Sequence, residues 1–314
     1  MSFPDPTVTA FLFPGQGSQK VGMGKALAAV YLEARAVFEE GDETLGFAIS
    51  KLCWEGPETE LNDTVNTQPA LMVHSVAALR VFQKLNPGFK PAFVAGHSMG
   101  ELSALVAAEA LAYPSALRLV RKRGELMKRA GQQNPGGMAA IMGLDIATLD
   151  AACAQASSGD EVVQVANDNC PGQVVISGHK AAVERAIEIA KASGAKRALP
   201  LAVSIAAHSP LMASAQEEFF HAVVLAPIKD AKIPLVGNVD AKPITDEVDL
   251  GADLQGQLTS RVRWTDSIRA MRQAGVTTFL ELGSGNVLSG LLKRIDTEAV
   301  GIALGEPEDF EKFS

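Results

Sequence analysis

The chain of 314 residues contains no uninterrupted apolar run of the roughly 18 residues that a membrane-spanning helix needs. Its cysteines are few, odd in number and widely spaced, which argues against a disulfide framework and a cysteine-based metal site: Cys53, Cys153 and Cys170. Basic residues are not in excess, because the formal net charge is -8. Binding to nucleic acid or to anionic membranes is therefore disfavoured, and we expect free thiols and no metal site.

The first residues lack the basic stretch and the apolar segment of a secretory signal, which predicts a cytoplasmic location. Hydrophobic residues make up 47% of the chain and charged residues 20%, as in ordinary globular proteins. The length exceeds the usual domain size of about 100 to 200 residues. We therefore expect either two domains or one large domain that carries an insertion.

The most informative segment is Gly-His-Ser-Met-Gly at 96–100, which lies between an apolar run at 92–95 and a helix-like stretch at 101–108. A Gly-x-Ser-x-Gly sequence between a strand and a helix is typical of a nucleophile elbow, which places the serine at the positive end of the helix. Ser98 is therefore the candidate nucleophile. The alternative is that Ser98 only caps a buried helix, since serine is a good N-cap residue.

Strands alternate with helices over most of the chain, which predicts an α/β fold with a mostly parallel sheet covered on both faces. Together with the elbow, this pattern favours a hydrolase-like core. The strands of this core are expected at 8–13, 92–95, 235–236 and 277–282. The helices are expected at 23–40, 69–85, 98–110, 114–130, 210–225, 264–274 and 287–294.

The turn-forming sequence Asn-Pro-Gly-Gly at 134–137 indicates a domain boundary. The order β-α-β-β-α-β follows it, with strands at 138–142, 161–166, 173–177 and 196–199 and helices at 146–156 and 180–193. This order is typical of ferredoxin-like domains. The sequence thus predicts a small ferredoxin-like domain at 133–202, inserted into a large catalytic domain of 1–132 and 203–314.

A serine nucleophile needs a base, and histidine is the usual one. His208 is the preferred candidate because it lies in a loop of small residues that leads from a strand into a helix. His97 is expected to pack beneath the elbow. The remaining three histidines are expected in structural or surface positions, within helices or at a helix start: His74, His179 and His221.

An oxyanion needs hydrogen-bond donors, and the backbone N–H of Met99 is the usual first donor after an elbow serine. The glycine-rich segment 15–19 follows the first strand and offers the side-chain amide of Gln16 as a second donor. The alternative is a phosphate-binding loop, but the segment matches neither glycine-rich phosphate motif. We therefore favour the amide donor.

Arg123 lies one helical turn from both Leu119 and Met127, on a largely apolar stripe. An inward guanidinium at this position suggests bidentate binding of a carboxylate. The alternative is that the neighbouring basic residues, Arg121 to Arg123, form a solvated charged face.

Eight segments in the same order resemble the bacterial malonyl-CoA:acyl carrier protein transacylases of fatty acid synthesis. They are FPGQGSQ at 13–19, TQPAL at 67–71, GHSMGE at 96–101, RG at 123–124, GMAAIMGL at 137–144, PGQVVISGHK at 171–180, GAKRALPL at 194–201 and NVD at 238–240. The resemblance covers nearly the whole chain. Each segment is short, but together and in order they are specific.

The resemblance implies an acyltransferase that moves malonyl from malonyl-CoA to the phosphopantetheine thiol of acyl carrier protein, by a ping-pong mechanism through a malonyl ester of Ser98. It implies that His208 acts as base and then as acid, that Met99 and Gln16 form the oxyanion hole, and that Arg123 binds the malonyl carboxylate. It also implies that the backbone carbonyl of Gln257 orients His208 in place of a carboxylate. No cofactor is implied, and the enzyme is expected to be a monomer.

Two other functions remain open from the residues alone. A serine hydrolase would use an acid between serine and histidine in the chain, and the candidates are Asp145, Asp150, Asp160 and Asp168. A non-catalytic module that docks acyl carriers could keep the fold without the chemistry. The presence of Ser98, His208 and Arg123 together disfavours this second alternative.

Overall fold

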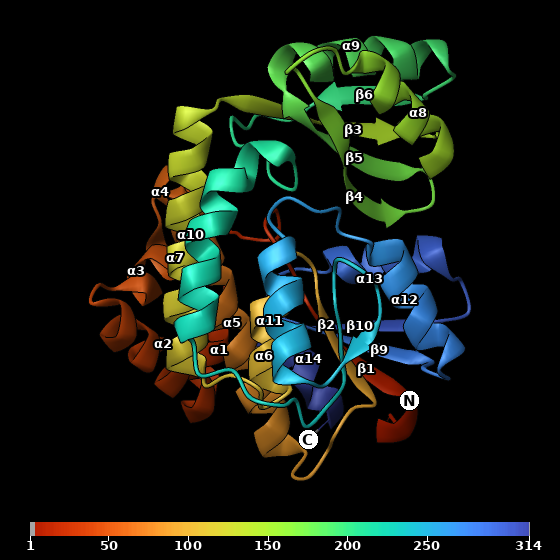
Figure 1. The fold of residues 1–314 in the computed structure, drawn as a ribbon. Helices are drawn as coiled ribbons and strands as arrows, with labels where there is room; N and C mark the ends of the chain where they lie inside the picture. Colours follow the sequence, from red (N-terminus) through yellow and green to blue (C-terminus); the bar gives the residue numbers. More distant parts are fainter. Residues whose placement is uncertain (1–3, 314) are drawn as a thin grey trace.

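The computed structural model describes residues 4–313 and contains two β-sheets (Figure 1). The larger sheet has the order β10-β9-β1-β2-β7-β8 and the smaller one β4-β5-β3-β6. The strands of the larger sheet are β1 (Thr9–Phe13), β2 (Phe93–Gly96), β7 (Leu235–Val236), β8 (Pro243–Ile244), β9 (Thr278–Leu282) and β10 (Val300–Leu304). Those of the smaller sheet are β3 (Gly136–Met142), β4 (Val163–Cys170), β5 (Gln173–His179) and β6 (Arg197–Pro200).

The larger sheet is parallel except for β8, which runs antiparallel to β7. Its side chains alternate between two apolar cores. Phe11 and Phe13 of β1 pack on the side of the helices that follow β2, whereas Ala10 and Leu12 face the opposite side. A sheet buried on both faces explains why β1 is buried throughout and apolar from Ala10 to Phe13.

The helices form a layer on each face of this sheet (Figure 1). The first layer and its outer helices are α1 (Lys25–Val30), α2 (Leu32–Leu45), α3 (Ile49–Glu55), α4 (Glu58–Leu61), α5 (Thr64–Leu85), α6 (Gly100–Ala107), α7 (Tyr113–Gln133), α10 (Ala213–Leu225) and α11 (Glu247–Gly256). The opposite face is covered by α12 (Trp264–Gln273) and α13 (Val287–Ile295). The short helices are η1 (Pro6–Val8), η2 (Pro210–Met212), α14 (Pro307–Phe310) and η3 (Glu311–Phe313).

The smaller sheet is antiparallel and is covered on its outer face by α8 (Ile146–Ala156) and α9 (Lys180–Ala192) (Figure 1). It has its own apolar core. The predicted order of strands and helices in this segment is observed. Edge strand β4 is joined to the rest of the molecule through Val262, whose N–H donates to Ala166 O at 2.8 Å and whose carbonyl accepts from Asp168 N at 2.9 Å.

The predicted helix at 23–40 is wrong in extent, because Tyr31 is extended (φ -112, ψ 124) and divides it into α1 and α2. Helix α5 begins five residues before Pro69, although a proline inside a helix removes a backbone donor. The carbonyl of Val65, four residues earlier, accepts a hydrogen bond from Arg121 Nη1 at 3.1 Å instead. Five further elements were not predicted from the sequence: α3, α4, α11, β8 and β10.

All three cysteines are free thiols, as predicted, and the structure places all three in buried positions. Within residues 4–313, no helix is long and apolar enough to cross a membrane. In the same part of the chain, no cluster of three or more histidine, cysteine, aspartate or glutamate side chains could hold a metal ion.

Candidate active site

The turn at 96–100 has the backbone geometry of a nucleophile elbow. Ser98 has φ 51, a left-handed conformation that is uncommon for residues other than glycine. A Cβ at Gly96 would collide with the backbone of Gly100, and a Cβ at Gly100 would collide with the carbonyl of Phe13. Both glycines are therefore required, and Ser98 lies directly before the N-terminus of α6.

His208 lies beside Ser98, with 2.8 Å between the hydroxyl Oγ and the imidazole Nε2. On the other side of the ring, Nδ1 is 2.8 Å from the backbone carbonyl of Gln257. A carbonyl can only accept, so Nδ1 carries the proton and Nε2 accepts the hydrogen bond from Ser98. The structure thus brings the predicted serine, histidine and orienting carbonyl together.

Burial and the neighbouring positive charge of Arg123 lower the pKa of His208 to about 3. The imidazole is therefore neutral at pH 7 and free to accept a proton. His208 also has a left-handed backbone, with φ 58. Strained backbone of this kind is concentrated at functional sites, where the surrounding structure must hold it in place.

Arg123 points inward, as predicted, and its side chain is only 2% exposed. Nη1 donates to Gln68 Oε1 at 2.8 Å, and Nη2 donates to Gln257 Oε1 at 2.7 Å and to Ser98 Oγ at 3.1 Å. The buried Nε has no hydrogen-bond partner. Burial lowers the pKa of Arg123 to about 10, so the guanidinium stays charged at neutral pH.

None of the ion pairs among the described residues includes Arg123. Its hydrogen-bond acceptors are neutral: two amides, a hydroxyl and the sulfur of Met127. A buried cation without a carboxylate partner is costly, so this position is suited to an anionic ligand that enters beside Ser98.

Met99 and Gln16, the predicted oxyanion donors, line the same cavity as Ser98, Arg123 and His208, with a volume of about 790 Å³. Gln16 Oε1 accepts from Thr64 Oγ1 at 3.1 Å, which leaves the amide nitrogen as the donor for a ligand. Met99 is the N-cap residue of α6. Its backbone N–H therefore lies at the positive end of that helix.

The other histidines occupy structural or surface positions. His97 is half-buried, its Nε2 is 2.8 Å from Asn169 Oδ1, and its ring meets Trp264 edge-on. His74 is buried in α5 with its Nε2 3.0 Å from Gly305 O. Of the other two histidines, His179 directly precedes α9 and accepts a hydrogen bond from a backbone N–H, and His221 is exposed on α10.

Three of the aspartates that a hydrolase could use have other partners. Asp145 caps α8, Asp150 forms an ion pair with Arg261, and Asp168 accepts from Thr265 Oγ1 at 2.6 Å. The fourth, Asp160, lies in the exposed turn before β4. The carbonyl of Gln257 occupies the position beside His208 Nδ1 that a triad acid would take.

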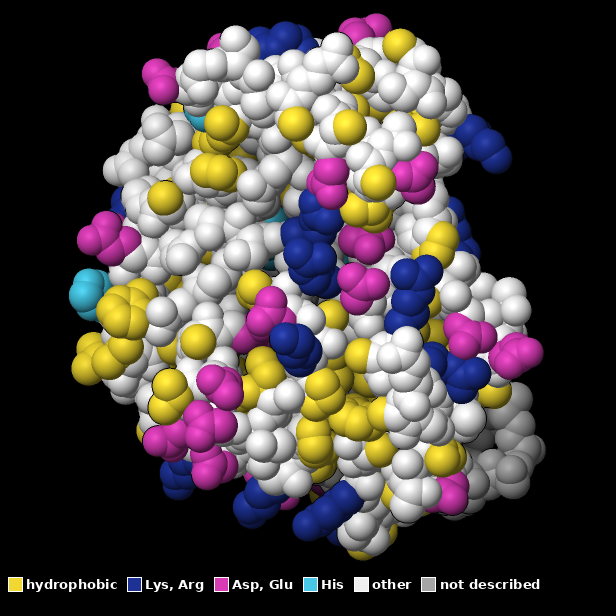
Figure 2. Space-filling model, turned by 45° about the vertical axis from the view of Figure 1, so that its right-hand side comes forward, with side chains coloured by type: hydrophobic (Ala, Val, Ile, Leu, Met, Phe, Trp, Pro, Cys, Tyr) yellow, Lys and Arg dark blue, Asp and Glu magenta, His cyan; other side chains and the backbone are white. Residues whose placement is uncertain are grey.

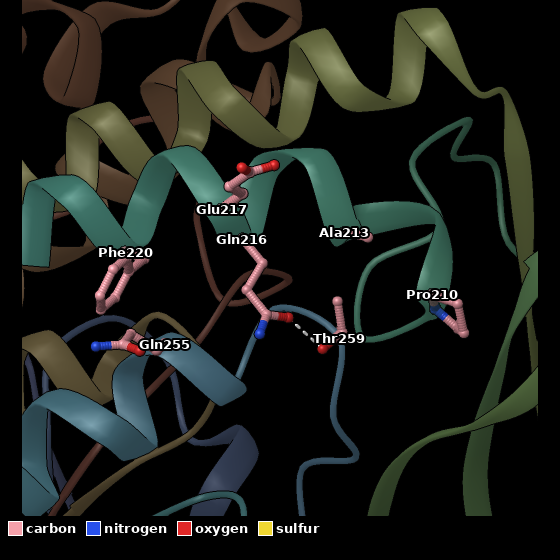
Figure 3. A pocket seen from close by; sticks show the side chains of 7 residues that line it. All are labelled: Pro210, Ala213, Gln216, Glu217, Phe220, Gln255 and Thr259. Carbon is pink, nitrogen blue, oxygen red and sulfur yellow. Dashed lines mark hydrogen bonds between the residues drawn. The ribbon is translucent and has the colours of Figure 1, made fainter.

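A second hollow lies on the outside of the molecule, between α10 and the end of α11 (Figure 3). Gln216 and Thr259 reach across it and hydrogen bond to each other, and Phe220 and Gln255 line one end. Glu217 is the single titratable side chain in its lining. The residues that line this hollow include no serine or cysteine in contact with a histidine, unlike the cavity at Ser98.

Three polar residues that support the site were not predicted from the sequence: Gln68, Asn238 and Glu101. Asn238 Oδ1 accepts from the backbone N–H of Ser98 at 2.9 Å, and Gln68 holds Arg123. Glu101 is 1% exposed beneath the elbow. In the sequence, each of the three is a polar residue within an apolar stretch or one of the family segments. That pattern alone does not distinguish a buried hydrogen-bonding role from a surface position.

A serine at a strand–helix turn that hydrogen bonds to a neutral histidine is typical of enzymes that pass an acyl group through a serine ester. The chain belongs to the acyl transferase domain family, whose model matches residues 10–297. Among its relatives is the malonyl CoA-acyl carrier protein transacylase of Bacillus subtilis (strain 168), which is 47% identical over 302 residues. That alignment covers 96% of this chain and 95% of the relative.

Solved structures agree with this assignment. An acyl carrier protein S-malonyltransferase from Vibrio cholerae superposes with a TM-score of 0.95 and 44% identity, covering 98% of this chain and 100% of the other. A malonyl-transacylase in complex with a type II polyketide acyl-carrier protein has a TM-score of 0.94 and 42% identity, with 97% and 98% covered. The predicted resemblance to malonyl transacylases is confirmed.

Proposed function

We propose that this protein transfers the malonyl group from malonyl-CoA to the phosphopantetheine thiol of acyl carrier protein, supplying extender units for fatty acid synthesis. The observation that carries the proposal is the convergence of Ser98, His208 and Arg123 in one cavity. The serine and the histidine provide a route for an acyl group. The buried guanidinium provides the contact for a free carboxylate at the far end of that group.

In the first half-reaction, Ser98 Oγ attacks the thioester carbonyl while His208 Nε2 takes the hydroxyl proton. The Met99 N–H and the Gln16 amide stabilise the oxyanion of the tetrahedral intermediate. The C–S bond then breaks, and His208 returns its proton to the departing sulfur of CoA. The products are free CoA and a malonyl ester on Ser98.

The second half-reaction runs the same steps in reverse with another thiol. His208 accepts the proton of the phosphopantetheine thiol, whose sulfur attacks the ester carbonyl. Ser98 leaves and regains its proton from His208. Because thioester and ester exchange is nearly isoenergetic, the enzyme must exclude water rather than supply driving force. Burial of His208, which is only 3% exposed, limits the access of water to the catalytic base.

We also propose that the carbonyl of Gln257 keeps Nδ1 of His208 protonated throughout, as a triad carboxylate does in many serine enzymes. A neutral acceptor orients the ring without adding negative charge. Arg123, 3.1 Å from Ser98 Oγ, would otherwise be attracted to such a carboxylate. Its charge therefore stays available for the malonyl carboxylate.

The finer description of the fold belongs to this proposal. We infer a hydrolase-like large domain of residues 1–132 and 203–314 and a ferredoxin-like small domain of 133–202. The strand order β4-β5-β3-β6 and its separate apolar core support the second description. Since one chain supplies every site residue, a monomer that needs no cofactor is the simplest active form. A cytoplasmic location stays a prediction.

The test is peptide mass spectrometry after incubation with malonyl-CoA. We expect a malonyl adduct on Ser98 that disappears in Ser98→Ala and on addition of the acyl carrier protein. Absence of the adduct in the intact protein would defeat the proposal and would favour a non-catalytic module that docks acyl carriers. Rapid release of free malonate without carrier would instead favour a hydrolase.

A further inference from the structure

Two buried carboxyl groups lie directly beneath the nucleophile turn. Glu101, in the first turn of α6, is 1% exposed, and Asp253 of α11 is 7% exposed. The backbone N–H of Asn238 donates to both, at 3.2 Å to Glu101 Oε2 and 3.1 Å to Asp253 Oδ2. Among the described ion pairs, neither acid has a basic partner.

Such a pair cannot carry two negative charges at low cost, so one member holds a proton. Burial raises the pKa of Glu101 well above its ordinary value, and the adjacent charge and hydrogen bond of Asp253 raise it further. Asp253 accepts the backbone N–H groups of both Asn238 and Val239, as an ionised carboxylate would. Both oxygens of Asp253 accept N–H groups, whereas the described N–H groups that reach Glu101 all donate to Oε2, which leaves Oε1 to carry the proton. This geometry favours a neutral Glu101 that donates its proton to Asp253.

The Glu101 carboxyl reaches the elbow through Asn238. Glu101 Oε2 accepts from the Asn238 side-chain amide. The same side chain clamps the turn, because its Oδ1 accepts from Ser98 N at 2.9 Å and its Nδ2 donates to Gly96 O at 2.8 Å. One oxygen of Glu101 thus sets the orientation of the amide that holds the backbone of the nucleophile.

The same oxygen reaches the other two site residues through Gln257, whose Nε2 donates to Glu101 Oε2 at 3.0 Å. With its amide oriented in this way, Gln257 Oε1 faces Arg123 Nη2 at 2.7 Å, and Nε2 also contacts Ser98 O at 3.0 Å. Its backbone carbonyl accepts from His208. A flipped Gln257 amide would present N–H groups to the guanidinium.

We propose that Glu101, as a neutral acid hydrogen-bonded to ionised Asp253, is a positioning residue that fixes the Asn238 and Gln257 amides and thereby aligns Ser98, His208 and Arg123. The inference rests on the proposed malonyl transfer and adds to it the group that orients its machinery. Asp253 is the buried anion of this arrangement.

The neutral form can be tested because glutamine resembles a protonated glutamate: both have one acceptor oxygen and a donor on the other terminal atom, and the amide adds a second N–H. Glu101→Gln can accept from both amides and donate to Asp253, whereas Glu101→Ala can do neither. Asp253→Asn places a donor where two backbone N–H groups and the Glu101 proton need acceptors. The three variants therefore separate hydrogen-bond geometry from charge.

The measurement is the rate of Ser98 acylation by malonyl-CoA and by acetyl-CoA, with melting temperatures to establish folding. Glu101→Ala and Asp253→Asn should lower kcat/KM for malonyl-CoA about 10- to 100-fold and reduce the malonyl-to-acetyl ratio, since Arg123 is no longer held. Glu101→Gln should recover activity to within about threefold of the wild type. A purely structural role would change stability without changing the ratio.

The matched control is Glu281→Gln. Glu281 is also fully buried, but it accepts from the N–H groups of Leu288 and Ser289 at 2.9 and 2.7 Å, away from the site. The malonyl-to-acetyl ratio of this variant should not change. A ratio that falls as far in Glu281→Gln as in Asp253→Asn would overturn the assignment.

Two further outcomes would overturn the proposal. If folded Glu101→Gln loses as much activity as Glu101→Ala, Glu101 is not the neutral partner. If Asp253→Asn keeps full activity and ratio, the pair does not position the site. Should Glu101→Ala not fold, the contrast between Glu101→Gln and Asp253→Asn decides. The malonyl adduct of the wild-type protein, measured alongside, tests the proposed function separately.

Discussion

Arg123→Ala is the sharpest perturbation of the proposed selectivity, because the guanidinium is buried and its acceptors in the protein are neutral. A malonyl carboxylate would complete a buried ion pair, and removing one partner of such a pair costs about 3 to 5 kcal/mol. At about 1.4 kcal/mol for each tenfold change, kcat/KM for malonyl-CoA should fall about 140- to 3,700-fold.

Acetyl-CoA brings no carboxylate, so it leaves the wild-type guanidinium unpaired and gains nothing from it. The malonyl-to-acetyl ratio should therefore fall by at least about 100-fold in Arg123→Ala. The assay is the initial rate of acyl transfer from each donor to the same carrier protein. Arg118→Ala, on the exposed face of the same helix, is the control and should leave the ratio unchanged. An equal loss for both donors would refute the carboxylate role.

Three other outcomes follow from the site. Because the pKa of His208 is lowered to about 3, kcat/KM for acylation should not fall as the pH is lowered through 6.5. In Arg123→Ala, which lacks the neighbouring positive charge, the fall in kcat/KM should occur at a higher pH than in the wild type. A wild-type kcat/KM that falls with a midpoint at pH 6.5 would contradict this. The unfolded histidine takes up a proton below its ordinary pKa of 6.5 while the folded one does not, so His208 costs stability as the pH falls from 6.5 towards 3. His208→Gln should therefore lose less free energy of unfolding than the wild type over pH 6.5 to 4, measured by urea titration, and should not be acylated. Gly96→Ala should lower the free energy of unfolding by about 1–3 kcal/mol, because its Cβ would meet the backbone of Gly100; unchanged stability would show that the turn can relax.

Local sequence patterns predicted most of the elements that bear the site. The elbow could be predicted because its two glycines follow from local geometry: a Cβ at either position would collide with backbone within the five-residue turn or in the adjacent strand. Helix α8 matches its predicted bounds, 146–156: Asp145 caps its first turn, and its apolar period continues to Ala156. Arg123 could be predicted to point inward because helical periodicity places it on the apolar stripe.

What local patterns could not predict depends on contacts between distant segments. Tyr31 interrupts a helical period that continues through it, and no local breaker marks the position. Helix α5 extends before Pro69 because Arg121, 56 residues from Val65, supplies the missing donor. Gln257 was assigned from the family resemblance alone, since its role rests on a backbone carbonyl that carries no residue signature.

The site departs from the rules that stabilise the rest of the chain, and the departures coincide with its chemistry. Ser98 and His208 have left-handed backbones, Arg123 is a buried cation without a carboxylate partner, and Glu101 is a buried acid. Each would cost stability if it stood alone. The side-chain amides of Asn238 and Gln257 link Ser98, Arg123 and Glu101, and the backbone carbonyl of Gln257 adds His208, so the cost of one group is offset by hydrogen bonds from the others. A network of this kind loses its alignment as a unit, which is why the Glu101 and Asp253 variants should affect selectivity as well as rate.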